Sequence, residues 1–70
     1  MQLYRRGDTG PAVAEIQATL LQLGLLAAPE PGFGDATDSA VRDFQQRRGV
    51  SVDGIVGPAS RTAMRRVLGL

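Results

Sequence analysis

The amino-acid sequence predicts an all-α domain, a compact three-helix bundle whose helices are joined by two ordered, glycine-containing loops. Apolar side chains recur at helical spacing in three segments, near residues 11–23, 35–48 and 58–68. Glycine and proline cluster between these segments, in 25–34 and 50–58, where they favour turns over regular structure. A chain of 70 residues has room for one small core, so residues 1–70 are predicted to form a single domain.

The first predicted helix begins at Pro11, a position where the missing N–H of proline is harmless because the first helical turn leaves its N–H groups unpaired. Its buried face is predicted from apolar residues spaced three and four apart, namely Val13, Ile16, Leu20 and Leu23. Gly24 follows directly, and glycine favours the left-handed conformation that ends many helices. Residues 11–23 are therefore predicted to form an amphipathic helix.

The second predicted helix covers residues 35–48 and ends before Gly49. Its inner face is predicted from the spacing of Ala36, Ala40, Val41, Phe44 and the aliphatic stem of Arg47. Two acidic residues lie near its start, and two basic residues lie at its end, namely Asp35, Asp38, Arg47 and Arg48. The helix dipole favours this order of charges, which supports the predicted direction and limits of the helix.

The third predicted helix, over residues 58–68, follows a loop with the sequence VSVDGIVGP. Asp53 and Gly54 form a strong turn pair in this loop, since glycine accepts a positive φ without strain. The apolar residues of the loop are too interrupted for a long strand, so we expect no two-stranded pairing within it. The helical stripe is predicted from the spacing of Ala59, Ala63, Met64, Val67 and Leu68.

One pattern at the start of the second helix returns 23 residues later at the start of the third, with Phe33-Gly34 aligned to Val56-Gly57. We expect each glycine to be the N-cap. We expect the hydroxyl residue three positions later, Thr37 or Ser60, to bond back to the N–H of the cap. The repetition therefore predicts two similar loop-to-helix junctions.

A second repeat places a glutamine directly after a core residue in each of the first two helices. These pairs are Ile16-Gln17 and Phe44-Gln45. We expect each amide to hydrogen-bond loop backbone at the edge of the core, and a direct contact with a ligand is the alternative.

Composition and charge exclude several classes of function. The chain has no cysteine and no histidine, which removes the commonest metal ligands and the commonest general base, so we predict no metal site and no cofactor. Asp35 and Asp38 could serve acid–base catalysis, but an exposed helix start is not the enclosed cleft that such chemistry requires. The sequence therefore predicts a module that is not an enzyme.

Nucleic-acid binding and membrane insertion are also disfavoured. The net charge is +1, and the basic group in the third helix, Arg61, Arg65 and Arg66, has few aromatic residues near it, which is a poor pattern for nucleic-acid binding. The helix dipole already favours cations at the end of this helix. No segment approaches the roughly 20 apolar residues of a membrane span. The stretch from Met1 to Arg6 is not followed by the apolar core of a signal peptide.

The ordered set of motifs resembles the peptidoglycan-binding-like domain, a three-helix module of bacterial cell-wall hydrolases and related enzymes. The resemblance covers nearly the whole chain. The matching pattern is Leu3-x-x-x-Gly7-x-x-Gly10-x-x-Val13-x-x-Ile16-Gln17-x-x-Leu20-x-x-x-Gly24, then Phe33-Gly34-x-x-Thr37-x-x-Ala40-Val41-x-x-Phe44-Gln45-x-x-x-Gly49-Val50, then Asp53-Gly54-x-Val56-Gly57-x-x-Ser60. Two positions depart from the family. The first turn, DGxFG in the family, is EPGFG here, with Pro31 placed at the position of the Asp, and Ser60 stands where threonine is usual.

The resemblance implies non-catalytic binding of peptidoglycan, through its glycan strand and stem peptide, and a catalytic domain in the same parent chain. It implies a location in the cell wall, outside the cell or in the periplasm, as part of a longer exported protein, and it leaves a cytoplasmic location open. The candidate ligand-binding residues are Phe33, Thr37, Arg42, Gln45, Arg48, Asp53 and Gly54. Arg42 or Arg48 would pair with a ligand carboxylate.

Four of these residues also have a structural interpretation. Phe33 would belong to the core, Thr37 to a helix start, Asp53 to a turn and Arg42 to the solvated surface. A different function is also open, a protein-interaction or regulatory module on the same fold, as in the propeptides of matrix metalloproteases. That fold alone does not fix the ligand.

Overall fold

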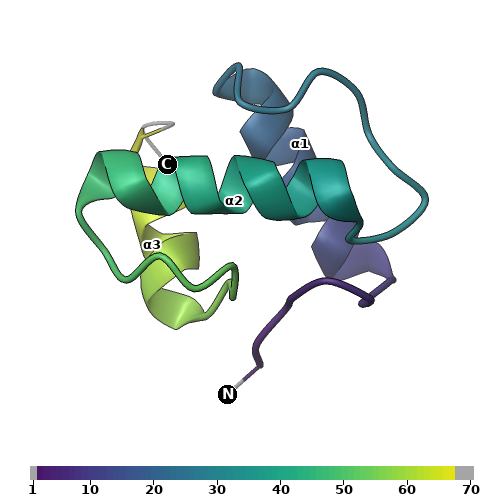
Figure 1. The fold of residues 1–70 in the computed structure, drawn as a ribbon, viewed down its shortest axis with the longest axis horizontal. Coiled ribbons are helices and arrows are strands. Elements are labelled where there is room, and N and C mark those ends of the chain that lie inside the picture. The colour runs from purple at the N-terminus through teal and green to yellow at the C-terminus, as the bar shows by residue number, and fades with distance from the viewer. Residues whose placement is uncertain (1, 68–70) are drawn as a thin grey trace.

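The structure is a computed structural model that describes residues 2–67. This part of the chain contains three helices, α1 (Pro11–Gln22), α2 (Asp35–Arg48) and α3 (Pro58–Val67). Figure 1 shows α2 across the centre of the molecule, with α1 towards its N-terminal end and α3 towards its C-terminal end. The predicted all-α bundle is confirmed, and the helix limits agree within one residue wherever the structure describes them.

One hydrophobic core joins the three helices to both loops. Its buried side chains come from α1 (Val13, Ile16, Leu20), α2 (Ala40, Val41, Phe44), α3 (Met64) and the intervening loops (Leu26, Phe33, Val56). The loops contribute three of these side chains because a domain of this size buries only about 60% of its surface, and its helices alone cannot close a core. None of the helices in residues 2–67 is long and apolar enough to cross a membrane.

The predicted inner face of α2 is wrong at its two ends. Ala36 and Arg47 are exposed, and the buried face begins instead with Thr37 and Asp38. Ala36 points outwards because Thr37, one position later, is held inwards by hydrogen bonds to the preceding loop. Arg47 lies beyond the core, where its Nε pairs with the Asp43 carboxylate at 2.9 Å.

The predicted stripe of α3 is also wrong at its edges. Ala59 is exposed, Val67 is 41% exposed, and Ser60 is buried instead. The inner row of α3 runs from Ser60 to Met64, one helical turn apart, so Ala59 is rotated away from the core. Val67 lies in the last turn, past the end of that row, and Leu68 lies outside the described residues.

The N-terminal segment connects the two loops, a feature that the sequence did not predict. Tyr4 and Val56 form an antiparallel bridge, in which Tyr4 N–H donates to Val56 O at 3.0 Å and Val56 N–H donates to Tyr4 O at 2.8 Å. Further along, Gly7 N–H donates to Phe33 O and Phe33 N–H donates to Asp8 O, both at 2.9 Å. As expected, residues 50–58 do not pair with one another; their loop pairs with the start of the chain (Figure 1).

Candidate functional site

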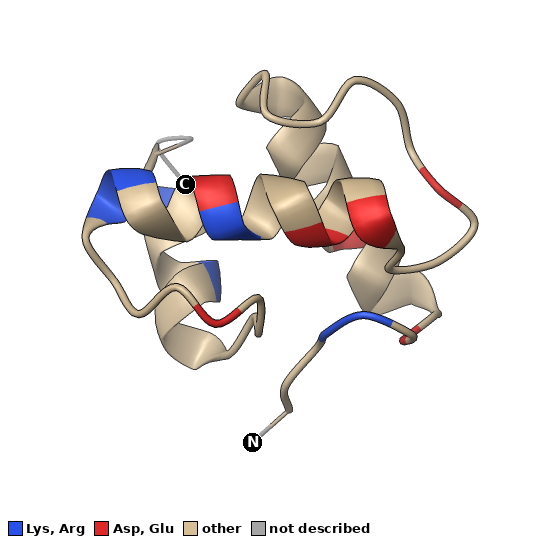
Figure 2. Cartoon of the chain, viewed as in Figure 1, with Lys and Arg blue, Asp and Glu red and all other residues tan. Residues whose placement is uncertain are grey.

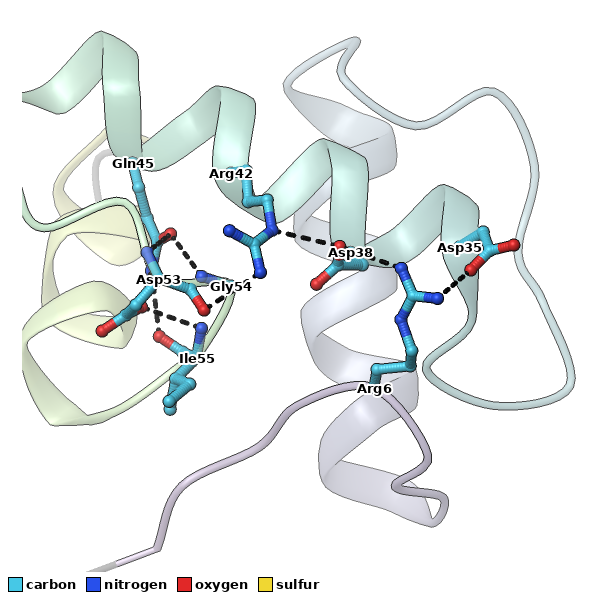
Figure 3. Close-up of polar contacts among 8 residues, drawn as sticks. All are labelled: Arg6, Asp35, Asp38, Arg42, Gln45, Asp53, Gly54 and Ile55. Atoms are coloured by element: carbon cyan, nitrogen blue, oxygen red, sulfur yellow. Dashed lines mark hydrogen bonds and ion pairs between the residues drawn. The ribbon is translucent and has the colours of Figure 1, made fainter.

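Gln45 fixes the loop between α2 and α3. Its Nε2 donates to Ile55 O at 2.9 Å and to the Asp53 carboxylate at 3.0 Å (Figure 3). Its Oε1 accepts the N–H groups of Asp53 at 3.2 Å and Gly54 at 3.1 Å. The Gln45 side chain is 1% exposed, so these four bonds use its polar atoms inside the protein. The expected role of this glutamine, bonding loop backbone at the edge of the core, is confirmed.

Gln17 fixes the loop between α1 and α2 in the same way. Its Nε2 donates to Gly32 O at 2.9 Å, and its Oε1 accepts the N–H of Glu30 at 3.3 Å. Glu30 and Gly32 lie 23 residues before Asp53 and Ile55, the two residues that bond Gln45 from the other loop. The two glutamines therefore hold two loops of related sequence through equivalent backbone groups.

This alignment corrects the prediction that Pro31 stands at the position of the family's Asp in the first turn. Glu30 stands at the position of Asp53, and Pro31 stands at the position of Gly54, so Pro31 does not replace the acidic residue. The Glu30 Oε1 accepts the N–H of Gly34 at 3.3 Å, the N–H of Thr37 at 2.8 Å and the Thr37 hydroxyl at 2.5 Å. The Glu30 side chain is longer than that of Asp53, and it accepts N–H groups at the start of α2 directly.

The expected capping role of Thr37 is therefore wrong. Gly34 is the N-cap of α2, as predicted, and as a glycine it has no side chain of its own to cap the helix. The Thr37 hydroxyl donates to the loop carboxylate of Glu30 and accepts a bond from Gln17 Nε2 at 3.2 Å. The N–H of Gly34, which the Thr37 hydroxyl was predicted to bond, donates instead to Glu30 from outside the helix.

Acidic and basic side chains form a chain along the exposed edge of α2. Asp38 is 8% exposed and accepts bonds from Arg6 Nη2 at 3.2 Å and Arg42 Nε at 3.1 Å (Figure 3). Arg6 also pairs with Asp35, and Arg42 Nη2 donates to Asp53 O at 3.3 Å. These contacts give both carboxylates a structural role, because they tie α2 to the N-terminal segment and to the second loop.

Hydrogen bonds lower the pKa values of the two loop carboxylates. The Thr37 hydroxyl, followed by the Thr37 N–H, holds the pKa of Glu30 below its usual value of 4.5, against the opposing effect of burial. The Ile55 N–H is the largest cause that lowers the pKa of Asp53 from 3.8, again against burial, and the Gln45 amide adds to it. Both carboxylates are therefore stabilised as anions in the folded state.

Stability should fall in acid as these carboxylates take up protons. Their contribution is complete above the unfolded pKa values, 4.5 and 3.8, and is lost as the pH falls through the lower, folded values. Thermal unfolding followed by circular dichroism between about pH 7 and about pH 2 measures this loss. Glu30→Gln should make it shallower, whereas Glu15→Gln, at an exposed carboxylate of α1 that pairs with Arg61 on the surface, should change the slope less. An unchanged slope in Glu30→Gln would contradict the assignment.

Gly54 is expected to resist substitution for two reasons that can be separated. Its φ is +74°, and a Cβ there would lie 2.7 Å from Asp38 Oδ1 and 2.8 Å from Arg42 Nη2. Gly24 has a similar φ of +77° but no atom within 4 Å of the added Cβ. Chemical denaturation should show a loss of about 2 kcal/mol for Gly54→Ala and about 1 kcal/mol for Gly24→Ala. Equal losses would show that backbone conformation alone sets the requirement for glycine.

The surface beside the second loop holds two adjoining hollows. The loop hollow, about 360 Å³, is lined by Leu3, Gln45, Val50, Ser51, Asp53, Ile55, Gly57, Pro58, Ala59 and Ser60. The arginine hollow, about 450 Å³, is lined by Arg48, Val50, Pro58, Ala59, Thr62, Ala63 and Arg66. Val50, Pro58 and Ala59 belong to both hollows, so the two form one groove along the start of α3.

The structure divides the predicted site residues into two sets. Phe33, Thr37, Gln45 and Gly54 are buried, whereas Arg42, Arg48 and Asp53 are exposed. Four of the seven residues meet around the second loop, namely Arg42, Gln45, Asp53 and Gly54. Arg48 lies on the arginine hollow, and Phe33 and Thr37 lie at the other loop. The groove also contains Arg66, which the sequence indicated only as part of a basic group in the third helix.

These features define a class of protein, a small helical domain whose loops are fixed by buried glutamines and whose surface offers a shallow groove. The chain belongs to the family of the peptidoglycan binding domain, whose family model matches residues 9–64. The resemblance that the sequence motifs indicated is therefore confirmed.

Several named proteins are similar to this chain. The N-acetylmuramoyl-L-alanine amidase CwlM of Mycobacterium tuberculosis is 43% identical over 72 residues, which cover 87% of this chain and 18% of the amidase. A spore cortex-lytic enzyme of Halalkalibacterium halodurans is 38% identical, over 93% of this chain and 20% of the enzyme. The chain thus spans about a fifth of the length of these curated relatives.

A solved structure has the same fold. The crystal structure of the SleB N-terminal domain superposes with a TM-score of 0.90 at 31% identity, over 94% of this chain and 92% of that one. The structural match extends over nearly the whole of both chains. The chain is thus similar to one module of larger cell-wall enzymes.

Proposed function

We propose that this domain binds peptidoglycan without catalysis and holds an attached wall-active enzyme on its polymeric substrate. The observation that carries the proposal is the family match over residues 9–64, together with relatives that are named as an amidase and a cortex-lytic enzyme. The length of those relatives supports a parent chain with a catalytic domain. The proposed location is accordingly the cell wall, as part of a longer exported protein.

The groove formed by the loop hollow and the arginine hollow is the proposed binding surface. Asp53 and Arg48 lie on it, and Arg42 lies at the second loop beside it. Peptidoglycan presents hydroxyls, amides and carboxylates, which these charged groups and the loop backbone can bond. In this proposal the buried residues Phe33, Thr37, Gln45 and Gly54 support the surface by fixing the two loops.

A single domain should bind weakly, because so shallow a groove buries little area. Attachment to a polymer compensates for a weak site, since neighbouring repeats of the polymer raise the effective concentration of ligand. A tandem fusion of two copies is therefore expected to bind wall far more tightly than one copy.

Co-sedimentation with insoluble, protein-free peptidoglycan tests the proposal, with chitin and DNA-cellulose as controls. The wild-type chain should pellet with the wall material alone. Ala59→Trp places an indole in the groove and should abolish most of the pelleting, whereas Ala14→Trp, at an exposed position of α1, should not. Circular dichroism verifies that both variants fold. If the folded wild type and its tandem fusion both stay in solution, the proposed function is wrong.

A further inference from the structure

The arginine hollow combines two cationic side chains with small apolar walls. Pro58, Ala59, Thr62, Ala63 and Arg66 form one face of α3, and Arg48 and Val50 complete the hollow from the end of α2 and the residues after it. No acidic side chain is among these lining residues. Figure 2 shows the same asymmetry along α2, with acidic residues at its start and basic residues at its end. The hollow is therefore an electropositive site.

Four of the eight arginines pair with a carboxylate of the described chain, and Arg48 and Arg66 belong to the other four. Arg6, Arg42, Arg47 and Arg61 each lie within 4.0 Å of an Asp or Glu carboxylate in the same molecule. Within residues 2–67, no such pair involves Arg48 or Arg66. The helix dipole favours cations at the ends of α2 and α3, but it does not require two of them to line one hollow. Among residues 2–67, no carboxylate competes with an outside anion for these two guanidinium groups.

We propose that the arginine hollow binds the free carboxylate of a peptide end whose last side chains are methyl groups, the chemistry of a wall stem peptide. This inference rests on the proposed function and assigns the ligand group that the hollow takes. Guanidinium groups form paired hydrogen bonds with a carboxylate, a geometry that neutral glycan hydroxyls cannot match. The walls of alanine, proline and valine leave space for methyl groups beside the carboxylate.

The test uses two probes that differ only at the carboxylate. The first is diacetyl-L-lysyl-D-alanyl-D-alanine, and the second is the same peptide with a C-terminal amide. Titrations followed by ¹H–¹⁵N NMR should shift the amide signals of Val50, Ala59 and Ala63 with the carboxylate peptide. The amide peptide should bind about tenfold more weakly, because it loses the charged hydrogen bonds.

A matched pair of double variants isolates the two arginines. Arg48→Gln with Arg66→Gln should weaken binding of the carboxylate peptide about tenfold and abolish the difference between the two probes. Arg47→Gln with Arg65→Gln removes the same charge from the neighbouring exposed positions, outside the hollow, and should leave both affinities unchanged. Equal losses in the two variants would assign the effect to net charge and overturn the proposal.

Other outcomes also decide the question. Equal binding of the two probes, shifts confined to other surfaces, or no binding at millimolar concentrations would each overturn the carboxylate assignment. Co-sedimentation reports separately on the proposed function. If the wild type pellets but shows no preference for the carboxylate peptide, the result would support wall binding and contradict the proposed carboxylate subsite. Carboxylate binding with no pelleting of either the wild type or its tandem fusion would support the subsite and contradict the wall-binding function.

Discussion

Replacing Gln45 by methionine should lower the free energy of unfolding by about 3 kcal/mol. Methionine is similar in size and shape, so the change removes polar atoms without opening a large cavity. It leaves the N–H groups of Asp53 and Gly54 and the carbonyl of Ile55 without their side-chain partner. Net contributions of about 1 kcal/mol for each of these three backbone bonds give the expected total, because the fourth partner, the exposed Asp53 carboxylate, can bond water instead.

Gln46→Met is the matched control, because Gln46 is the next residue and is exposed. Urea denaturation followed by circular dichroism should show a change of less than about 0.5 kcal/mol for this control. A similarly small change in Gln45→Met would mean that water replaces the amide without loss and that the loop does not depend on it. Hydrogen exchange should also speed up at Gly54 in the Gln45 variant, since the donor of that bond would be exposed.

The helices could be predicted from sequence because their signals are local. The spacing of Val13, Ile16 and Leu20 is a property of consecutive residues, and Gly49 marks a helix end by its own conformational freedom. The structural role of Gln45 was also predictable, since a polar residue directly after a core residue meets the edge of the core. These features need no knowledge of how distant segments pack.

The contacts that correct the prediction join residues far apart in the chain. Asp38 is buried because Arg6 approaches it from the N-terminal segment, 32 residues away, and no local pattern indicates that approach. The role of Glu30 had one sequence signal, its alignment with Asp53 at an offset of 23 residues. The arginine hollow had none, because Arg48 and Arg66 belong to different helices and become neighbours of one hollow only when α2 and α3 pack.

Phe33→Ala should be the most destabilising of these changes, with a loss of about 3–5 kcal/mol. Phe33 is 2% exposed and belongs to the core, although it comes from a loop. Its backbone also bonds Gly7 and Asp8, so the ring anchors the segment that joins the two loops. A domain of 70 residues has a total stability of roughly 4–10 kcal/mol, so Phe33→Ala should be close to unfolding at 25 °C.

Phe33→Leu separates packing from ligand contact, the two roles that the sequence allowed for this residue. Leucine retains apolar volume in the core and should lower the free energy of unfolding by about 1 kcal/mol. If Phe33 acts by packing, Phe33→Leu should fold and pellet with peptidoglycan as the wild type does. A variant that stays folded by circular dichroism but loses wall binding would instead place the aromatic ring in contact with the ligand. Burial at 2% exposure favours the first result, because a ring enclosed by the core has almost no surface to offer a polymer.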